Sequence, residues 1–349
     1  MFIFSWKEFK YLLKSILFFI VYFSGTLHLG ILFSKKVKKR HVATILFYHR
    51  FCDGSNDPYH LPHLDIKDFK KQMCHIKRWY RVITMDELAD KLTGRKYFVS
   101  PSIAITIDDG YLNNYTLAYP VLKALGLPAI IYLTTGLIGT NKAPWVDSLM
   151  DVLSQTKGKE LRFPELLGDE TVDISTPKGK RDAEIKLFKV MLKLEDKKRI
   201  RALEKLSKML AVNETSKRNA NRIMMNWGEV MEMVVNGISF GAHTVTHPIL
   251  SKMELERSKQ EIYESKIEIE ERVGRKVRHF AVPNGKNEDF NDELKRYCKE
   301  IGMLTVASTE SGVVSDQSDP YFLKRINPPP PIYIFACELA RDMFLRRSK

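Results

Sequence analysis

Two adjacent carboxylates stand at the end of an apolar segment, in the sequence SIAITIDDGY. Asp108 and Asp109 would repel each other if both were ionised, so the pair needs either a nearby cation or a raised pKa. A metal ion on one carboxylate would resolve the conflict and leave the other free to act as a base. The alternative is a helix cap or an Asx turn, which an isolated Asp-Gly pair usually forms.

A second cluster, GAHTVTHP, holds His243 and His247 four residues apart. The β-branched residues between them and Pro248 after them favour a strand running into a loop over a helix. Even spacing puts both imidazoles on one side of such a segment. Two histidines and one carboxylate form a three-ligand set with a position left open for water and substrate, as in catalytic zinc sites. A purely structural histidine pair is the alternative.

These residues need a scaffold that brings distant segments together. After residue 41, short apolar runs alternate with helical periodicity, which indicates parallel strands joined by crossover helices. The expected strands are 42–48, 102–107, 129–134, 238–242, 279–282 and 304–307, and the expected helices are 66–79, 85–92, 117–125, 227–235, 255–273 and 289–301. Functional loops gather at the carboxyl ends of such strands. Because the strands are few and irregularly spaced, we expect an α/β fold with a distorted (β/α) barrel.

Residues 145 to 222 interrupt the alternation, since they are densely charged and contain no convincing strand pair. Leucines recur there at helical spacing, which predicts a helical insertion within a single domain spanning residues 41–349. The charged run 178–208 is a solvated face or, alternatively, a surface that meets a membrane or guides substrate. Trp145 with Asp147 lines the site, or the tryptophan, which opens an amphipathic helix, serves only in packing. Pro328 to Pro331 should lead into a final helix.

Residues 1–40 form a hydrophobic and basic segment. Eight lysines and arginines stand there against Glu8 alone, a net charge of +7, so half of the chain's +14 lies in this segment and does not mark a nucleic-acid site elsewhere. The run from Ile16 to Phe33 carries no residue charged at neutral pH unless His28 is protonated, and it approaches the length that spans a bilayer. We expect membrane association, either spanning or interfacial. Basic residues on both sides leave the orientation open.

Taken together, the motifs resemble the polysaccharide deacetylase family, the NodB-homology group or carbohydrate esterase family four. ITIDDG is similar to the family's first motif, TFDDG, and HTVTH matches its second, HSxxH or HTxxH. The resemblance runs from about Thr44 to about Arg325 and includes FAVPNG. It implies a deacetylase-type barrel in which Asp109, His243 and His247 bind a divalent ion, with zinc expected, and Asp108 is the catalytic base. The implied reaction removes N-acetyl or similar N-acyl groups from a polysaccharide or other glycan.

Two family features are missing from their usual places. The third motif normally supplies an arginine that orients the base, but here the stretch reads HFAVPNG, and Arg278 stands two residues ahead of Phe280. The usual leucine-x-histidine acid is replaced by YFLKRINPPP. A circularly permuted branch, similar to the poly-N-acetylglucosamine deacetylases, takes its acid from near the N-terminus. That resemblance makes His49, in ILFYHR, the candidate general acid, unless it is a rim histidine bonded only to backbone.

The missing arginine keeps a second class open, a non-catalytic, membrane-associated glycan-binding protein on the same fold. A glycosidase fits less well, because its two carboxylates stand roughly 5 to 9.5 Å apart and usually on different strands. A nucleotide hydrolase fits least, since the chain has no G-x-x-x-x-G-K-[ST] loop. The expected partners are therefore an N-acetylated polysaccharide or a lipid-linked glycan, and a membrane.

Overall fold

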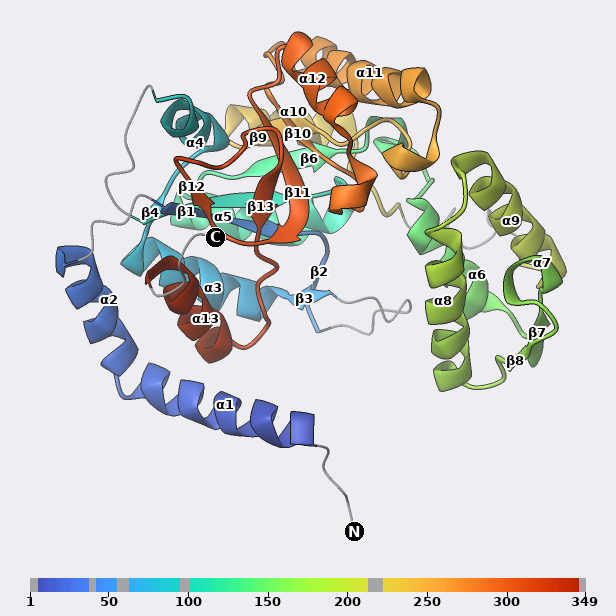
Figure 1. Ribbon diagram of the computed structural model, residues 1–349, viewed down its shortest axis with the longest axis horizontal. Coiled ribbons are helices and arrows are strands. Elements are labelled where there is room, and N and C mark those ends of the chain that lie inside the picture. Colours follow the sequence, from blue (N-terminus) through green and yellow to red (C-terminus); the bar gives the residue numbers. More distant parts are fainter. Residues whose placement is uncertain (1–5, 38–41, 55–62, 95–100, 213–221, 345–349) are drawn as a thin grey trace.

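The computed structural model describes residues 6–37, 42–54, 63–94, 101–212 and 222–344. Its centre is a curved sheet in which seven parallel strands follow one another as neighbours: β1 (Val42–Tyr48), β5 (Ser102–Ile107), β6 (Ile130–Leu133), β9 (Ser239–Ala242), β10 (His279–Ala281), β11 (Thr305–Ser311) and β13 (Leu323–Arg325). Ile326, directly after β13, returns to the first strand. Its amide donates to Ile45 O at 2.8 Å, and its carbonyl accepts from Phe47 N at 3.1 Å. The sheet therefore nearly closes into a barrel (Figure 1).

The barrel is distorted, as expected. The pairing of β11 with β13 shifts register between Ala307 and Ser311. Short strands flank the main ones: β4 (Arg81–Val82) pairs with the start of β5, and β12 (Val314–Ser315) runs antiparallel to β1. A separate two-stranded sheet joins β2 (Phe51–Cys52) to β3 (Leu64–Asp65). The predicted α/β barrel is thus confirmed, with the strands of the first half close to their predicted ranges.

Helices cover the outside of the sheet: α3 (Ile66–Trp79), α4 (Met85–Leu92), α5 (Tyr119–Leu125), α10 (Trp227–Val235), α11 (Leu255–Val273), α12 (Asp292–Glu300) and α13 (Ile332–Phe344). Capping boxes fix two of the starts, Thr84 with Glu87 before α4 and Asn226 with Glu229 before α10. A π-helical turn, η1 (Asn114–Ala118), precedes α5, so the helix expected from residue 117 begins inside that turn. The helix predicted after the proline run is α13.

Side chains of the strands alternate between the barrel interior and the surrounding helices. In β5, Ile103 and Ile105 belong to the large apolar cluster shared with the helices, whereas Ala104 belongs to the smaller interior cluster. Thr106 likewise faces inward, where its hydroxyl donates to Leu46 O and accepts from Arg325. Because strand side chains repeat every two residues, the same alternation carries Asp108 to the inside at the carboxyl end.

Residues 145–212 form a unit beside the barrel, built from α6 (Trp145–Gln155), α7 (Pro164–Leu167), α8 (Pro177–Met191) and α9 (Asp196–Met209) around their own apolar cluster (Figure 1). The expectation that this region has no strand pair was wrong. β7 (Glu160–Arg162) and β8 (Thr171–Asp173) form an antiparallel hairpin. Each strand buries only one apolar side chain, Leu161 or Val172, between exposed polar ones. Three residues are too few to show a strand period. Residues 213–221 lie outside the described residues.

The apolar run near the N-terminus forms two helices, α1 (Trp6–Phe23) and α2 (Thr26–Val37), which meet at a bend of 75°. Gly25 sits at the bend with a φ of 79°, a conformation that glycine adopts readily. Within the described ranges, no single helix has the length and hydropathy needed to cross a membrane; α1 and α2 meet that test only as a bent pair. α1 lies along α13, under the barrel in Figure 1.

Candidate active site

The two adjacent aspartates reach the same rim because the chain turns sharply between them. Asp108 continues β5, and its amide donates to Tyr48 O at 2.8 Å. An extended chain would point Asp109 to the opposite face, but Asp109 has a φ of 77° and Gly110 a φ of 89°. A Cβ on Gly110 would come within 2.8 Å of the Leu133 side chain. The turn therefore requires glycine, and it brings both carboxylates into one pocket.

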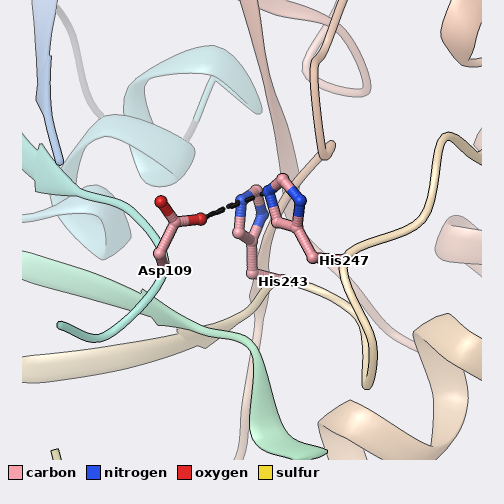
Figure 2. Close-up of side chains that lie close together, drawn as sticks. All are labelled: Asp109, His243 and His247. Atoms are coloured by element: carbon pink, nitrogen blue, oxygen red, sulfur yellow. Dashed lines mark ion pairs between the residues drawn. The ribbon is translucent and has the colours of Figure 1, made fainter. Parts of the chain in front are cut away.

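Asp109 meets the two predicted histidines. Its Oδ1 lies 3.3 Å from His243 Nε2 and 3.2 Å from His247 Nε2. Figure 2 shows the two imidazoles side by side, both turned toward the carboxylate. Asp109 and His243 are buried, and the His247 side chain is 14% exposed. The sequence thus predicted this cluster residue for residue as a spatial grouping.

A buried glutamate holds the loop that carries the histidines. Glu261 of α11 is 2% exposed, and its carboxylate accepts hydrogen bonds from Val245 N, Thr246 N and the Thr246 hydroxyl, each at 2.9 Å. The loop needs such support because two of its residues, Thr244 and His247, have left-handed φ values of 66° and 61°. Sequence reasoning missed Glu261, since its place in the charged run LERSKQEIYESKIEIEE gives no sign of burial.

The donor set of Asp109, His243 and His247 fits a divalent ion. Three ligand atoms, one from each residue, lie within 4.8 Å of one another. The observed separations of 3.2 and 3.3 Å match the spacing of about 3.3 Å between ligand atoms on a tetrahedral zinc with bonds of about 2.0 Å. His243 Nδ1 lies 2.7 Å from Ala281 O. Because a carbonyl can only accept, Nδ1 carries a proton, which leaves Nε2 to offer its lone pair when a metal ion is bound, as metal-binding histidines do.

The electrostatics of Asp109 agree with this fit. Burial by itself would raise the pKa of the Asp109 carboxyl, but the contacts with His243 and His247 outweigh burial and hold the pKa well below its usual range. Asp109 Oδ1 is buried, and among the described residues it has no partner in good hydrogen-bond geometry, since the two Nε2 atoms face it at 3.2 and 3.3 Å without aligned bonds. A buried, ionised carboxylate oxygen without a donor needs a cation.

Asp108 is bound by an arginine from inside the barrel. Arg325 Nη1 donates to Asp108 Oδ1 at 2.8 Å and Arg325 Nη2 to Oδ2 at 2.7 Å, while its Nε donates to Ser308 O at 2.7 Å. Both side chains are buried, at 0% and 1% exposure. Burial alone would raise the pKa of Asp108, yet the charge and hydrogen bonds of Arg325 lower it. The carboxylate is therefore fixed in orientation and ionised.

Sequence reasoning missed Arg325. The third-motif region does not supply the base-orienting arginine, since Arg278 is exposed and lies 3.3 Å from Asp86, as expected. The arginine that binds Asp108 comes from YFLKRINPPP, the stretch that replaces the usual general acid. The available signal was an arginine near the end of the resemblance, where the family's general acid usually stands. Its charge suggested the surface, since arginines are rarely buried unless paired.

His49 stands at the same rim as Asp108. β1 and β5 pair in register up to Tyr48 and Ile107, so the next residues, His49 and Asp108, are neighbours. His49 Nε2 lies 3.7 Å from Asp108 Oδ2, and the His49 side chain is 44% exposed. Its carbonyl, rather than its ring, is the group that accepts a bond from Asn114 Nδ2. The ring can therefore reach a molecule bound over the aspartates.

The aspartates and histidines lie at the floor of a cavity of about 500 Å³. One wall comes from the barrel rim and includes Pro283, Asn284 and Pro328. The opposite wall comes from the 145–212 unit and includes Trp145, Asp147, Met150, Glu184 and Phe188. Trp145 and Asp147 thus line the pocket. The Trp145 ring also stacks on Phe188, with centroids 5.6 Å apart, and Arg199 lies 5.0 Å from it.

Asp147 ties this wall to the barrel. Tyr111, two residues after Asp109, donates its hydroxyl to Asp147 Oδ2 at 2.7 Å, and Arg50 Nη2 lies 3.4 Å from the same oxygen. The Arg50 guanidinium also covers the Tyr111 ring at 4.0 Å. Burial and the carboxylates of Asp147 and Asp109 raise the pKa of Tyr111 well above its usual range, so the phenol stays a donor. The wall is therefore fixed relative to the aspartates.

Comparisons with known proteins agree with this arrangement. The family model described as polysaccharide deacetylase matches residues 96–185 and 196–306. YxkH of Bacillus subtilis (strain 168), which carries the name of a polysaccharide deacetylase, is 34% identical over 105 residues, or 30% of this chain. That match spans 36% of YxkH, about a third of its length.

Two solved structures share the fold. The deacetylase PplD of Streptococcus pyogenes, solved in complex with acetate, has a TM-score of 0.57 at 18% identity over 86% of this chain and 98% of PplD. IcaB from Ammonifex degensii has a TM-score of 0.55 at 17% identity over 87% of this chain and 98% of IcaB. At these identities the likeness concerns the fold alone.

Proposed function

The chain belongs to the polysaccharide deacetylase family, and on that basis we propose that it hydrolyses the N-acetyl or a similar N-acyl amide of a glycan, leaving a free amine and a carboxylic acid. The observation that carries the proposal is that two adjacent aspartates line one pocket but have different partners. Asp108 is oriented and kept ionised by Arg325. Asp109 is turned toward two imidazoles. One carboxylate is thus available for proton transfer and the other for a cation.

Asp109, His243 and His247 would hold a divalent ion, with zinc as our proposal from the nitrogen-rich donor set. Such an ion, when bound, supplies Lewis-acid polarisation of the amide carbonyl and lowers the pKa of a water molecule. Glu261 supports this set indirectly through the loop backbone.

The chain's own groups would move the protons. Asp108, ionised and held by Arg325, accepts a proton from the water that attacks the amide carbon. The carbon–nitrogen bond then breaks, and the amine leaves with a proton from His49, which lies 3.7 Å from Asp108 on the open side of the pocket. The immediate products are the carboxylic acid and the free amine. The acid then gives its proton to the amine, and the proton held by Asp108 restores His49. Arg325 touches no substrate in this scheme and acts by positioning Asp108.

The pocket walls support a sugar as the substrate. Aromatic and apolar side chains from the 145–212 unit face polar groups of the barrel rim across the cavity, and sugars bind between such surfaces because they present apolar C–H faces and polar hydroxyl edges. The pocket is open enough for one residue of a longer chain. An N-acetylated polysaccharide is the substrate class we propose, and a lipid-linked glycan is the finer alternative.

A direct assay tests the proposal. The zinc-loaded full chain would be incubated with N-acetylglucosamine oligomers, peptidoglycan fragments and acylated lipid-linked sugars, and released acid and new amines would be measured together. We expect one substrate class to yield equal amounts of acid and amine. The Asp108→Asn variant should release neither product while it keeps its zinc. Sugar binding without release, by a metal-loaded protein, would favour the non-catalytic glycan-binding class instead. That class drew its support from a missing arginine, and Arg325 removes this argument.

A further inference from the structure

The helices α1 and α2 expose a continuous apolar surface. Seven large side chains of α1 from Leu12 onward and three of α2 are about half exposed or more: Leu12, Leu13, Ile16, Leu17, Phe19, Ile20 and Phe23, with Leu29, Leu32 and Phe33. Soluble monomers scatter such residues singly, whereas a contiguous apolar surface marks a contact with a partner or a membrane. We call these ten residues the apolar face.

A helix of a water-soluble protein turns its apolar stripe to the core, whereas α1 exposes a broad apolar stripe. Its half-buried side toward the barrel mixes Lys14 and Ser15 with Phe18, Val21 and Tyr22. Lys14 Nζ lies 2.6 Å from Glu338 of α13, and Ser15 shares a 3.0 Å hydrogen bond with the Tyr333 hydroxyl. Most of the apolar face points away from the protein, and only Phe19 at its edge also touches Tyr333. Such an outward apolar stripe is stabilised where it meets an apolar medium.

The bent pair is fastened to the barrel at both halves. α1 is held by the Lys14 and Ser15 contacts, and its Phe19 ring packs edge-on against Tyr333 at 5.6 Å. In α2, Ile31 is 1% exposed within the main core, and the His28 ring stacks on Trp79 at 4.6 Å. A straight helix across a bilayer would have to break these contacts and remove the 75° bend. The attachment therefore favours a helix pair that lies flat.

The charge around the apolar face favours an anionic bilayer over a second copy of the chain as its partner. Basic residues flank the apolar run in the sequence, with Lys7, Lys10 and Lys14 before it and Lys35, Lys36, Lys38, Lys39 and Arg40 after it. A second copy of this chain would bring two such segments, each of net charge +7, into contact. An anionic bilayer instead attracts each basic residue by about 1 kcal/mol near its surface. Flanking lysines with an apolar stripe between them are typical of helices that lie in the head-group region.

We propose that α1 and α2 form an in-plane docking surface for an anionic lipid bilayer, with the apolar face buried at the head-group boundary and neither helix crossing the membrane. The C-terminal helix α13 connects this surface to the pocket. α1 packs against α13, and the residues just before α13 contribute Asn327 and Pro328 to the pocket wall. The bilayer would then hold the pocket at a fixed orientation. Docking is independent of catalysis and is tested without it.

Vesicle flotation tests docking. The full chain should float with vesicles of phosphatidylcholine and phosphatidylglycerol, and less with phosphatidylcholine alone. The double variant Leu17→Glu/Ile20→Glu should lower the partition constant by about tenfold or more. The matched control is Ile185→Glu/Ile200→Glu, which changes two exposed isoleucines of the 145–212 unit and should float like the wild type. Failure of the wild type to float, or equal loss in both double variants, would overturn the proposal.

The depth of residue 23 in the bilayer distinguishes a helix pair that lies in the membrane plane from one that spans the membrane. Phe23 is next to the bend, so a straight spanning segment would carry it to the bilayer centre and a flat pair would keep it shallow. The signal that Phe23→Trp adds to a chain with Trp6→Phe, after subtraction of the signal from Trp79, Trp145 and Trp227, should be quenched more by lipids labelled at acyl carbon 5 than at carbon 12. Stronger quenching at carbon 12 would establish a spanning helix and contradict the in-plane geometry. If the lipid-free wild type sedimented as a dimer and the Leu17→Glu/Ile20→Glu variant as a monomer, the apolar face would be a contact with a second copy, and the proposal would be overturned.

Discussion

Arg325 binds both carboxylate oxygens of Asp108 although the two residues are 217 positions apart in the chain. Neither side chain has any appreciable solvent exposure. Because Arg325 belongs to β13, the orientation of Asp108 depends on the last strand of the barrel. A buried ion pair of this kind is costly to break, because removal of one partner leaves an uncompensated charge, at roughly 3–5 kcal/mol.

Arg325→Lys should shift the acid side of the rate–pH profile to higher pH. Lysine keeps the charge but loses the two-pronged contact, so the pKa of Asp108, now lowered by Arg325, should rise toward its usual value. Asp108 accepts a proton only when ionised, so activity is lost as pH falls through this pKa. Turnover at neutral pH should also fall, on the order of 10²-fold, through misplacement of the base. An unshifted acid limb would show that another group is the base.

His243→Ala combined with His247→Ala should abolish zinc binding. Metal content of the purified full chain, measured by elemental analysis, should fall from about one ion per chain to none. His49→Ala is the matched control, because His49 lines the same pocket outside the ligand set and should leave the metal in place. A chelator should lower the melting temperature of the wild type but not of the double variant, since only the folded wild type binds the ion. Full zinc retention by the double variant would contradict the assignment.

Glu261→Gln should weaken metal binding without touching a ligand. An amide can replace only one of the two carboxylate oxygens as an acceptor, so the loop with its two left-handed residues loses support. We expect the zinc dissociation constant to rise on the order of 10- to 100-fold. Glu256→Gln on the same helix, where the side chain is 82% exposed, should leave it unchanged. If only thermal stability fell and zinc affinity did not, Glu261 would have no positioning role.

His49→Gln should slow hydrolysis of glycan amides by about 10²- to 10⁴-fold, the usual contribution of a general acid. The decisive comparison uses an aryl acetate, whose phenolate leaves without a proton. On that substrate the variant should stay within a few fold of the wild type, and its zinc content should match. Equal losses on both substrates would mean that His49 does not protonate the leaving group.

Sequence patterns predicted the elements whose residues carry a long or repeated signal. The ranges of β1, β5, α3 and α11 were predicted to the residue, because continuous β-rich apolar runs and amphipathic periodicity are strong local signals. The short motifs likewise predicted which residues gather around Asp109.

What was missed depends on contacts between distant segments. β13 has three residues, Leu323, Lys324 and Arg325, two of them charged, so it shows neither apolar continuity nor a countable alternation. Arg325 can be buried because Asp108 neutralises its charge inside the barrel. A local sequence pattern does not reveal this contact between distant residues. The apolar run was predicted as one segment, and the bend at Gly25 follows from the separate attachment of α1 and α2 to the protein.

The closure of the barrel through β13 also sets an order of events during synthesis. On the ribosome, the Asp108 turn and both histidines emerge well before residue 325. Until Ile326 pairs with β1, the carboxylate of Asp108 has no guanidinium beneath it, and the nascent chain carries a ligand set but no oriented base. If the proposed hydrolysis takes place, the last strand would delay it until the sheet is complete, and release of the acid would report on a fully folded molecule.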